Sequence, residues 1–127
     1  MTNKFSTSSR RRLDECHPDL QRLMEHVLIW QDITILCGHR GKEEQDKAFF
    51  SGYSKLRYPH SKHNTSPSVA VDVQPYGVDI QGWNNDRYKR EWEDFCQKVV
   101  DTGKALGVEV RSLGLEYGWD YYHFELA

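Results

Sequence analysis

The stretch "YPHSKHNTSPSVAVDVQPY", residues 58–76, indicates both the fold and a candidate site. Valines alternate over residues 69–73, which is the pattern of a strand that buries one face. The same alternation sends Ala70 and Asp72 to the opposite face, where a carboxylate beside so small a neighbour leaves room for a ligand. His60 and His63 precede this strand in a polar loop that can fold back toward Asp72. We therefore expect a metal site here, with a surface histidine and a solvated aspartate as the alternative.

A second stretch, "GWDYYHFEL" at residues 118–126, supplies another histidine on the polar face of a strand. Apolar and polar side chains alternate there, so His123 points away from the core. Together with His63 and Asp72, it makes a set of two imidazoles and one carboxylate. Such a set leaves one coordination position of a zinc ion open, which is typical of catalytic rather than structural sites.

Two charged residues give this set the groups that amide hydrolysis needs. Asp120 lies in the turn that enters the last strand, where it can take a proton from water and pass it to a leaving amine. Arg40 follows another expected strand and can stabilise a developing oxyanion, alongside the metal. We therefore predict catalytic roles for Asp120 and Arg40.

Several neighbouring side chains have competing interpretations. His60 is a rival metal ligand to the favoured histidine of the same loop. Glu125 is a metal ligand, a hydrogen-bond partner of an imidazole or, as we favour, a solvated residue of an edge strand. Trp119 is expected to line the cleft and bind substrate, whereas Trp83 and Trp92 are expected in the core, as most tryptophans are.

The remainder of the chain predicts an α+β fold, in which a small antiparallel sheet packs against helices. Some segments show helical spacing and others strict alternation, and the two kinds do not follow one another as parallel crossovers would require. The expected helices span residues 18–29, 42–52 and 87–106. The expected strands span residues 32–38, 69–73, 108–112 and 121–127. The cluster at residues 8–12 is interpreted as the serine-capped start of a further helix with a solvated face.

Composition restricts the class of protein. With 127 residues, of which 38% are hydrophobic, the chain can build one domain, expected over residues 1–127, but hardly two. A net charge of -2 with interspersed signs gives no reason to expect a nucleic-acid partner. The chain shows neither a membrane-spanning segment nor a signal peptide, so we expect a cytoplasmic monomer without stable membrane association. The three cysteines form no CxxC pair and are expected to be reduced.

Three motifs, "ILCGHRGKEEQ", "SKHNTSPSVAVDV" and "WDYYHFEL", occur in the order and approximate spacing found in the M15-type zinc peptidases. The chain resembles this family over most of its length, and most of all its phage L-alanyl-D-glutamate endopeptidases, or endolysins. The resemblance implies the fold of D-Ala-D-Ala carboxypeptidases and hedgehog proteins, with a site across a small antiparallel sheet. It also implies that His63, Asp72 and His123 are the zinc ligands.

The same resemblance assigns roles to four further residues. Asp120 falls on the position of the catalytic acid, and Arg40 on that of an arginine that binds substrate or stabilises the transition state. Gln45 and Ser61 match positions that accompany them, and we expect both to bind substrate.

The implied activity is hydrolysis of the L-alanyl-D-glutamate bond in peptidoglycan stem peptides. The enzyme would accumulate in the host cytoplasm until it is released to the cell wall. Two alternatives stay open: a D-alanyl-D-alanine carboxypeptidase or dipeptidase of the same family, and a non-catalytic zinc-bearing module that binds the wall. The presence of Asp120 and Arg40 beside a full ligand set argues against the module.

Overall fold

The computed structural model describes residues 2–80 and 86–127. Within these ranges, helices and strands occur in mixed order, as the sequence predicts. The helices are α1 (Thr7–Asp14), α2 (Pro18–Trp30), α3 (Lys42–Phe50), the 3-10 turn η1 (Lys62–Asn64), α4 (Asp86–Leu106) and α5 (Leu113–Tyr117). The strands are β1 (Ile33–Cys37), β2 (Ala70–Pro75), β3 (Val110–Ser112) and β4 (His123–Leu126).

The four strands form one sheet in the order β1-β2-β4-β3, and every neighbouring pair is antiparallel. The predicted α+β class is thereby confirmed. Strand β2 lies between β1 and β4, with Asp72 opposite Cys37 on one side and opposite His123 on the other. The side chains of Cys37, Asp72 and His123 therefore form a polar row that crosses the sheet from β1 to β4.

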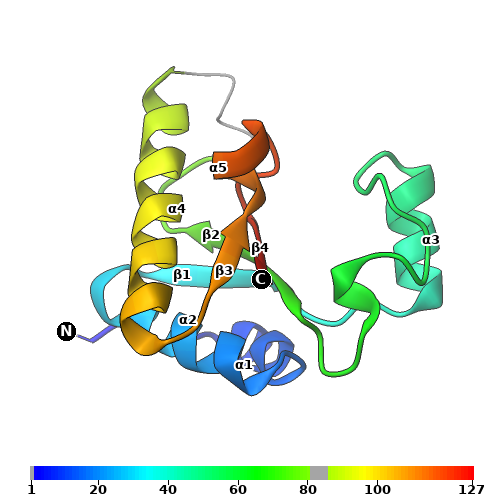
Figure 1. The fold of residues 1–127 in the computed structure, drawn as a ribbon, viewed down its shortest axis with the longest axis horizontal. Helices are drawn as coiled ribbons and strands as arrows, with labels where there is room; N and C mark the ends of the chain where they lie inside the picture. Colours follow the sequence, from blue (N-terminus) through cyan, green and yellow to red (C-terminus); the bar gives the residue numbers. More distant parts are fainter. Residues whose placement is uncertain (1, 81–85) are drawn as a thin grey trace.

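The core lies on the opposite face of the sheet. Val71 and Val73 of β2 and Phe124 of β4 are completely buried there, as the alternation of the sequence predicts. Helices α2 and α4 pack against each other, and α1 packs against β1 (Figure 1). Trp92 of α4 is also fully buried, and its indole N–H donates to the carbonyl of Asp79, so the predicted core position is confirmed.

Helix α3 and the segment after it, residues 42–60, form an arm that stands away from the sheet (Figure 1). Gln45 is the one buried residue of α3. Two ring contacts join the arm to the residues just before β4. Tyr53 stacks on Tyr122 with ring centroids 5.7 Å apart, and the Lys55 ammonium lies 4.1 Å from the centroid of the Trp119 ring.

The largest local departure from the sequence-based expectation is the short helix α5, which follows β3 directly. The Ser112 hydroxyl accepts from the backbone N–H of Leu115 and so caps this helix, and Gly118 ends it in the left-handed conformation. Strand β4 begins later than expected, because residues 118–122 turn the chain before it enters the sheet. Within the described ranges, no helix has the length and apolar character that crossing a membrane requires.

Candidate active site

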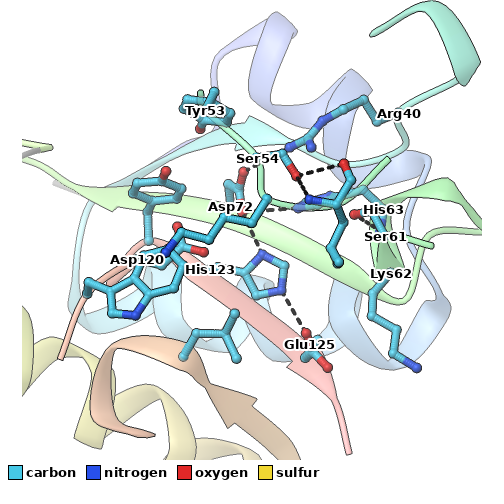
Figure 2. A pocket seen from close by; sticks show the side chains of 15 residues that line it. Arg40, Tyr53, Ser54, Ser61, Lys62, His63, Asp72, Asp120, His123 and Glu125 are labelled. Atoms are coloured by element: carbon cyan, nitrogen blue, oxygen red, sulfur yellow. Dashed lines mark hydrogen bonds and ion pairs between the residues drawn. The ribbon is translucent and has the colours of Figure 1, made fainter. Parts of the chain in front are cut away.

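The site is centred on Asp72, which is only 1% exposed. Its Oδ1 lies 3.1 Å from His63 Nε2 and 3.3 Å from His123 Nδ1, so two imidazoles converge on one carboxylate oxygen (Figure 2). His123 is the cross-strand neighbour of Asp72, whereas His63 reaches the same face from η1. The structure thus brings together the three residues that the sequence predicts as metal ligands.

Each imidazole is oriented by a partner at its other nitrogen. His63 Nδ1 lies 2.7 Å from the carbonyl oxygen of Gly38, which can only accept, so Nδ1 carries the proton. His123 Nε2 lies 2.9 Å from Glu125 Oε1, and the carboxylate likewise selects the protonated nitrogen. In the neutral imidazoles, the nitrogens that face Asp72 are therefore the ones able to offer lone pairs to a cation. Outer partners of this kind are typical of metal-bound histidines, so the donor set fits a divalent metal ion.

The charges of the site support the same conclusion. Burial alone lowers the pKa of His63, but the Asp72 carboxylate outweighs it and raises the pKa to about 10. Burial likewise opposes the charged form of His123, while hydrogen bonds to Asp72 and Glu125 raise its pKa to about 9. Burial also disfavours the charged form of Asp72, yet the two imidazoles hold its pKa well below the usual range. A metal cation would take the place of the protons that face this carboxylate.

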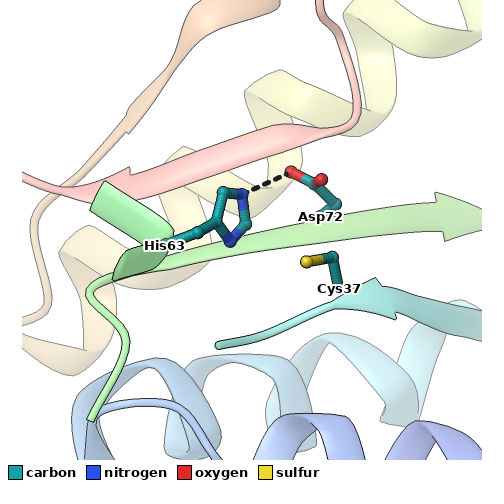
Figure 3. A group of neighbouring side chains, drawn as sticks. All are labelled: Cys37, His63 and Asp72. Carbon is teal, nitrogen blue, oxygen red and sulfur yellow. Dashed lines mark hydrogen bonds and ion pairs between the residues drawn. The ribbon is translucent and has the colours of Figure 1, made fainter. Parts of the chain in front are cut away.

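Cys37 adds a fourth potential donor, for which the sequence predicts only a reduced thiol. Donor atoms of Cys37, His63 and Asp72 all lie within 4.8 Å of one another (Figure 3). The thiol belongs to the same cross-sheet row as Asp72, but Cys37 is absent from the described lining of the cavity, whereas His123 is part of it. We therefore retain the set of His63, Asp72 and His123 and treat Cys37 as its neighbour.

Arg40 lies beside this centre and is almost completely buried. Its Nη2 is 3.5 Å from Asp72 Oδ2, and its Nη1 donates to Gln45 Oε1 at 2.9 Å. The amide nitrogen of Gln45 donates to Ser54 Oγ at 2.9 Å and also to the carbonyl of Leu56. The fully buried side chain of Gln45 thus connects Arg40 to the Ser54–Leu56 segment of the arm.

Ser61 lies at the start of η1, on the wall of the cavity. Its hydroxyl accepts from the backbone N–H of His63, and the Asn64 side chain accepts from the backbone N–H of Ser61, which makes a reciprocal cap. The Asn64 amide also donates to the Arg40 carbonyl at 2.9 Å. The cap fixes the backbone that carries His63.

Asp120 occupies the turn before β4, as predicted. Its φ of 63° places it in the left-handed region, which costs free energy for a residue with a side chain and often marks functional sites. Its carbonyl accepts from the backbone N–H of His123 at 3.1 Å. Burial, opposed by the nearby His123, raises the pKa of the carboxyl above its ordinary value. A carboxyl with a raised pKa is suited to exchanging protons with a reacting group.

These side chains surround a cavity of about 120 Å³. Such a volume holds a reacting bond and its nearest groups rather than a whole stem peptide. Its lining comes from the sheet, from η1, from the turn before β4 and from the arm (Figure 2). The lining residues are Arg40, Tyr53, Ser54, Lys55, Leu56, Ser61, Lys62, His63, Asp72, Leu113, Trp119, Asp120, Tyr122, His123 and Glu125.

A family model for phage L-alanyl-D-glutamate peptidases matches residues 1–123. The chain belongs to this family. It is accordingly a peptidase of bacterial peptidoglycan, and the alternative of a non-catalytic wall-binding module is set aside. No curated protein sequence matches the peptidase.

The fold of the peptidase is also found among solved structures. The L-Ala D-Glu endopeptidase ChiX of Serratia marcescens superposes with a TM-score of 0.74 and is 24% identical in sequence. The match covers 98% of the peptidase and 91% of the ChiX chain. At this level of identity, the likeness establishes the shared fold.

Glu125 corrects one sequence-based interpretation. We favoured a solvated residue on an edge strand, but Glu125 is 6% exposed and binds both His123 and Arg111. The reason is the strand order: β3 pairs with the outer side of β4, so β4 is not an edge. His60, the rival ligand, is exposed and does not line the cavity. Trp83 lies outside the described residues.

Proposed function

We propose that the peptidase hydrolyses the L-alanyl-D-glutamate bond of stem peptides with the aid of a zinc ion held by His63, Asp72 and His123. The convergence of two oriented imidazole nitrogens on one buried carboxylate oxygen carries this proposal. When bound, zinc would supply a Lewis acid that polarises the scissile carbonyl and lowers the pKa of a water molecule.

Asp120 is the residue that we propose to move the proton. Its carboxyl lines the cavity and has a raised pKa, so it can accept a proton from the attacking water and later release it. The proton then passes to the amine of the D-glutamyl residue as the amide bond breaks.

Arg40 is proposed to stabilise the negative charge that develops on the carbonyl oxygen. The guanidinium is buried, so its field is little screened, and its hydrogen bond to Gln45 fixes it before substrate arrives. The structure supports positioning roles for Gln45 and Ser61, since the first holds Arg40 and the second caps the turn of His63. Trp119 is proposed to contact the substrate at the cavity wall.

We propose that residues 1–127 make one catalytic domain, that the enzyme acts as a monomer, and that it accumulates in the host cytoplasm until it is released to the wall. The proposed reaction does not depend on the domain organisation, the oligomeric state or the location of the enzyme.

A digest of purified sacculi, with and without a zinc chelator, tests the proposed reaction. Mass spectrometry should detect stem peptides that begin at D-glutamate, with L-alanine left on the glycan, and the chelator should abolish their release. Loss of terminal D-alanine alone would instead indicate a carboxypeptidase, and undiminished release in the presence of chelator would contradict the role of zinc.

The variant Asp120→Ala separates proton transfer from metal binding. It should keep one zinc ion per chain, measured by elemental analysis, and lose hydrolysis by about 100-fold or more. If the variant also loses zinc, Asp120 is a ligand and the proposed role is wrong.

A further inference from the structure

Lys55 is placed at the cavity by its neighbours in the arm. The residues on either side of it, Ser54 and Leu56, both accept hydrogen bonds from the buried amide of Gln45. All three residues of this segment line the cavity. The backbone of Lys55 is therefore anchored on both sides, while its side chain is free to reach across the cavity wall.

The ammonium group of Lys55 meets an aromatic ring rather than a carboxylate. It lies 4.1 Å from the centroid of the Trp119 ring, on the wall formed by the turn before β4. Within the described ranges, no carboxylate forms an ion pair with Lys55 inside 4.0 Å. A cation–π contact at a solvent-accessible site is weak, so the ammonium can leave the ring for a carboxylate at little cost.

The other cations of the cavity are placed differently. Arg40 already faces Asp72 and donates to Gln45. Lys62 is exposed and lies on the side of the cavity toward Glu125 (Figure 2). Lys55 is therefore the cation of the lining that contacts Trp119, the residue directly before the proposed proton donor Asp120 in the chain.

The proposed substrate carries a negative charge that is complementary to the Lys55 ammonium. A glutamyl residue continues a peptide chain through one of its two carboxyl groups and keeps the other as a free carboxylate. In an L-alanyl-D-glutamate substrate, this residue carries the amine that leaves, so a negative charge enters the cavity beside the scissile bond. A carboxylate that is removed from water requires a cationic partner.

We propose that Lys55 is a specificity-determining residue that binds the free carboxylate of the D-glutamyl residue. The inference rests on the proposed function and adds to it the reason why a glutamyl residue follows the scissile bond. Trp119 holds the ammonium in the absence of substrate, and Gln45 keeps the segment of Lys55 in place. Neutralising the substrate carboxylate should therefore remove the contribution of Lys55.

The test uses two glycan-linked stem peptides that differ only at the second carboxyl group of the D-glutamyl residue. One peptide has this group as the free carboxylate, and the other has it as a carboxamide. The wild-type enzyme should prefer the carboxylate by about 10- to 100-fold in kcat/KM, the range expected for a charged hydrogen bond. Lys55→Met should lose about that factor on the carboxylate substrate and stay within about twofold of wild type on the carboxamide. Lys55→Arg should retain the preference.

Lys104→Met is the matched control, because it removes the same charge from an exposed position of α4. Zinc content and circular dichroism show that each variant is folded. Equal losses on both substrates would show that Lys55 only supports the structure, and loss of the preference in Lys62→Met instead of Lys55→Met would assign the contact to the other lysine. Either result overturns the inference. The sacculus digest decides the proposed function separately, so a wild type that passes it but shows no preference contradicts this inference alone.

Discussion

The two walls of the cavity are built in opposite ways. On the sheet side, Asp72, His123 and Glu125 are each less than 9% exposed, and strand pairing fixes their backbones. On the arm side, Tyr53 and Leu56 are nearly half exposed, and the segment is held through the side chain of Gln45 and by ring contacts. The difference fits the proposed roles of the two sides: the sheet carries Asp72 and His123, two of the three proposed metal ligands, and the arm is proposed to contact the substrate. Substitutions on the two sides should therefore fail in different ways.

The largest effect is expected from His123→Ala on the sheet side. The variant removes a metal donor and leaves Asp72 and Glu125 without their shared imidazole. Zinc affinity should fall by more than the roughly 10- to 100-fold that loss of an outer partner causes, and hydrolysis should be lost. His26→Ala, at an exposed histidine of α2, is the control. Tight stoichiometric zinc in His123→Ala would remove His123 from the ligand set.

A strong pH dependence of zinc binding is the second expectation for the sheet side. In the metal-free enzyme, Asp72 raises the pKa of His63 to about 10 and that of His123 to about 9, so both imidazoles tend to be charged at neutral pH. Binding must displace these protons, so affinity should weaken as pH falls below these values, by about tenfold per pH unit for each proton released.

Calorimetry at pH 7 in buffers of different ionisation enthalpy measures this release directly. About two protons per zinc ion are expected, one from each imidazole. A heat of binding that is independent of the buffer would show that the imidazoles are already neutral in the metal-free enzyme.

Gln45→Ala should have a smaller effect, confined to the arm side. The change removes the acceptor of Arg40 Nη1 and one of the two donors to the Leu56 carbonyl, at a cost of about 1–3 kcal/mol. Zinc content should be unchanged, while kcat/KM should drop by about 10- to 100-fold. Glu44→Ala, at the exposed preceding position of α3, should behave as wild type. Loss of zinc in Gln45→Ala would mean that the two walls are not independent.

Cys37→Ser should have the smallest effect. Cys37 adjoins Asp72 across the sheet but does not line the cavity, so we expect zinc stoichiometry and activity within about twofold of wild type. Cobalt substitution sharpens the test, because a thiolate ligand gives an intense ultraviolet charge-transfer band. Such a band in the wild type that vanishes in Cys37→Ser would make Cys37 a ligand and extend the metal site to β1.

The sheet side was largely predictable from the sequence. Alternation in β2 and β4 places Asp72 and His123 on the polar face, and this face is where the structure has them. The helices α2 and α4 also lie close to their predicted bounds, since long apolar stripes specify helices well. Two of the three motifs that resemble the family, residues 61–73 and 119–126, come from this same side, and the first motif, residues 35–45, extends into the arm.

The remaining features depend on contacts between distant segments, which alternation does not specify. Glu125 is buried because β3 pairs beyond β4, and a single strand does not reveal its neighbours in a sheet. Cys37 approaches Asp72 through a register that includes a bulge in β1. The contact of Lys55 with Trp119 joins the arm to a turn far along the chain, and neither segment has a periodic pattern. These features required the structure.

The pairing of β2 with β4 also has a consequence for how the enzyme matures. The two strands are separated in the chain by α4, β3 and α5, so their pairing is a late, long-range event that a newly made chain completes only after β4 has emerged from the ribosome. Asp72 and His123 are brought together by that pairing alone. A nascent chain therefore lacks the donor set until the sheet is closed. With zinc bound as proposed, the metal content of a preparation would measure the fraction of correctly folded molecules.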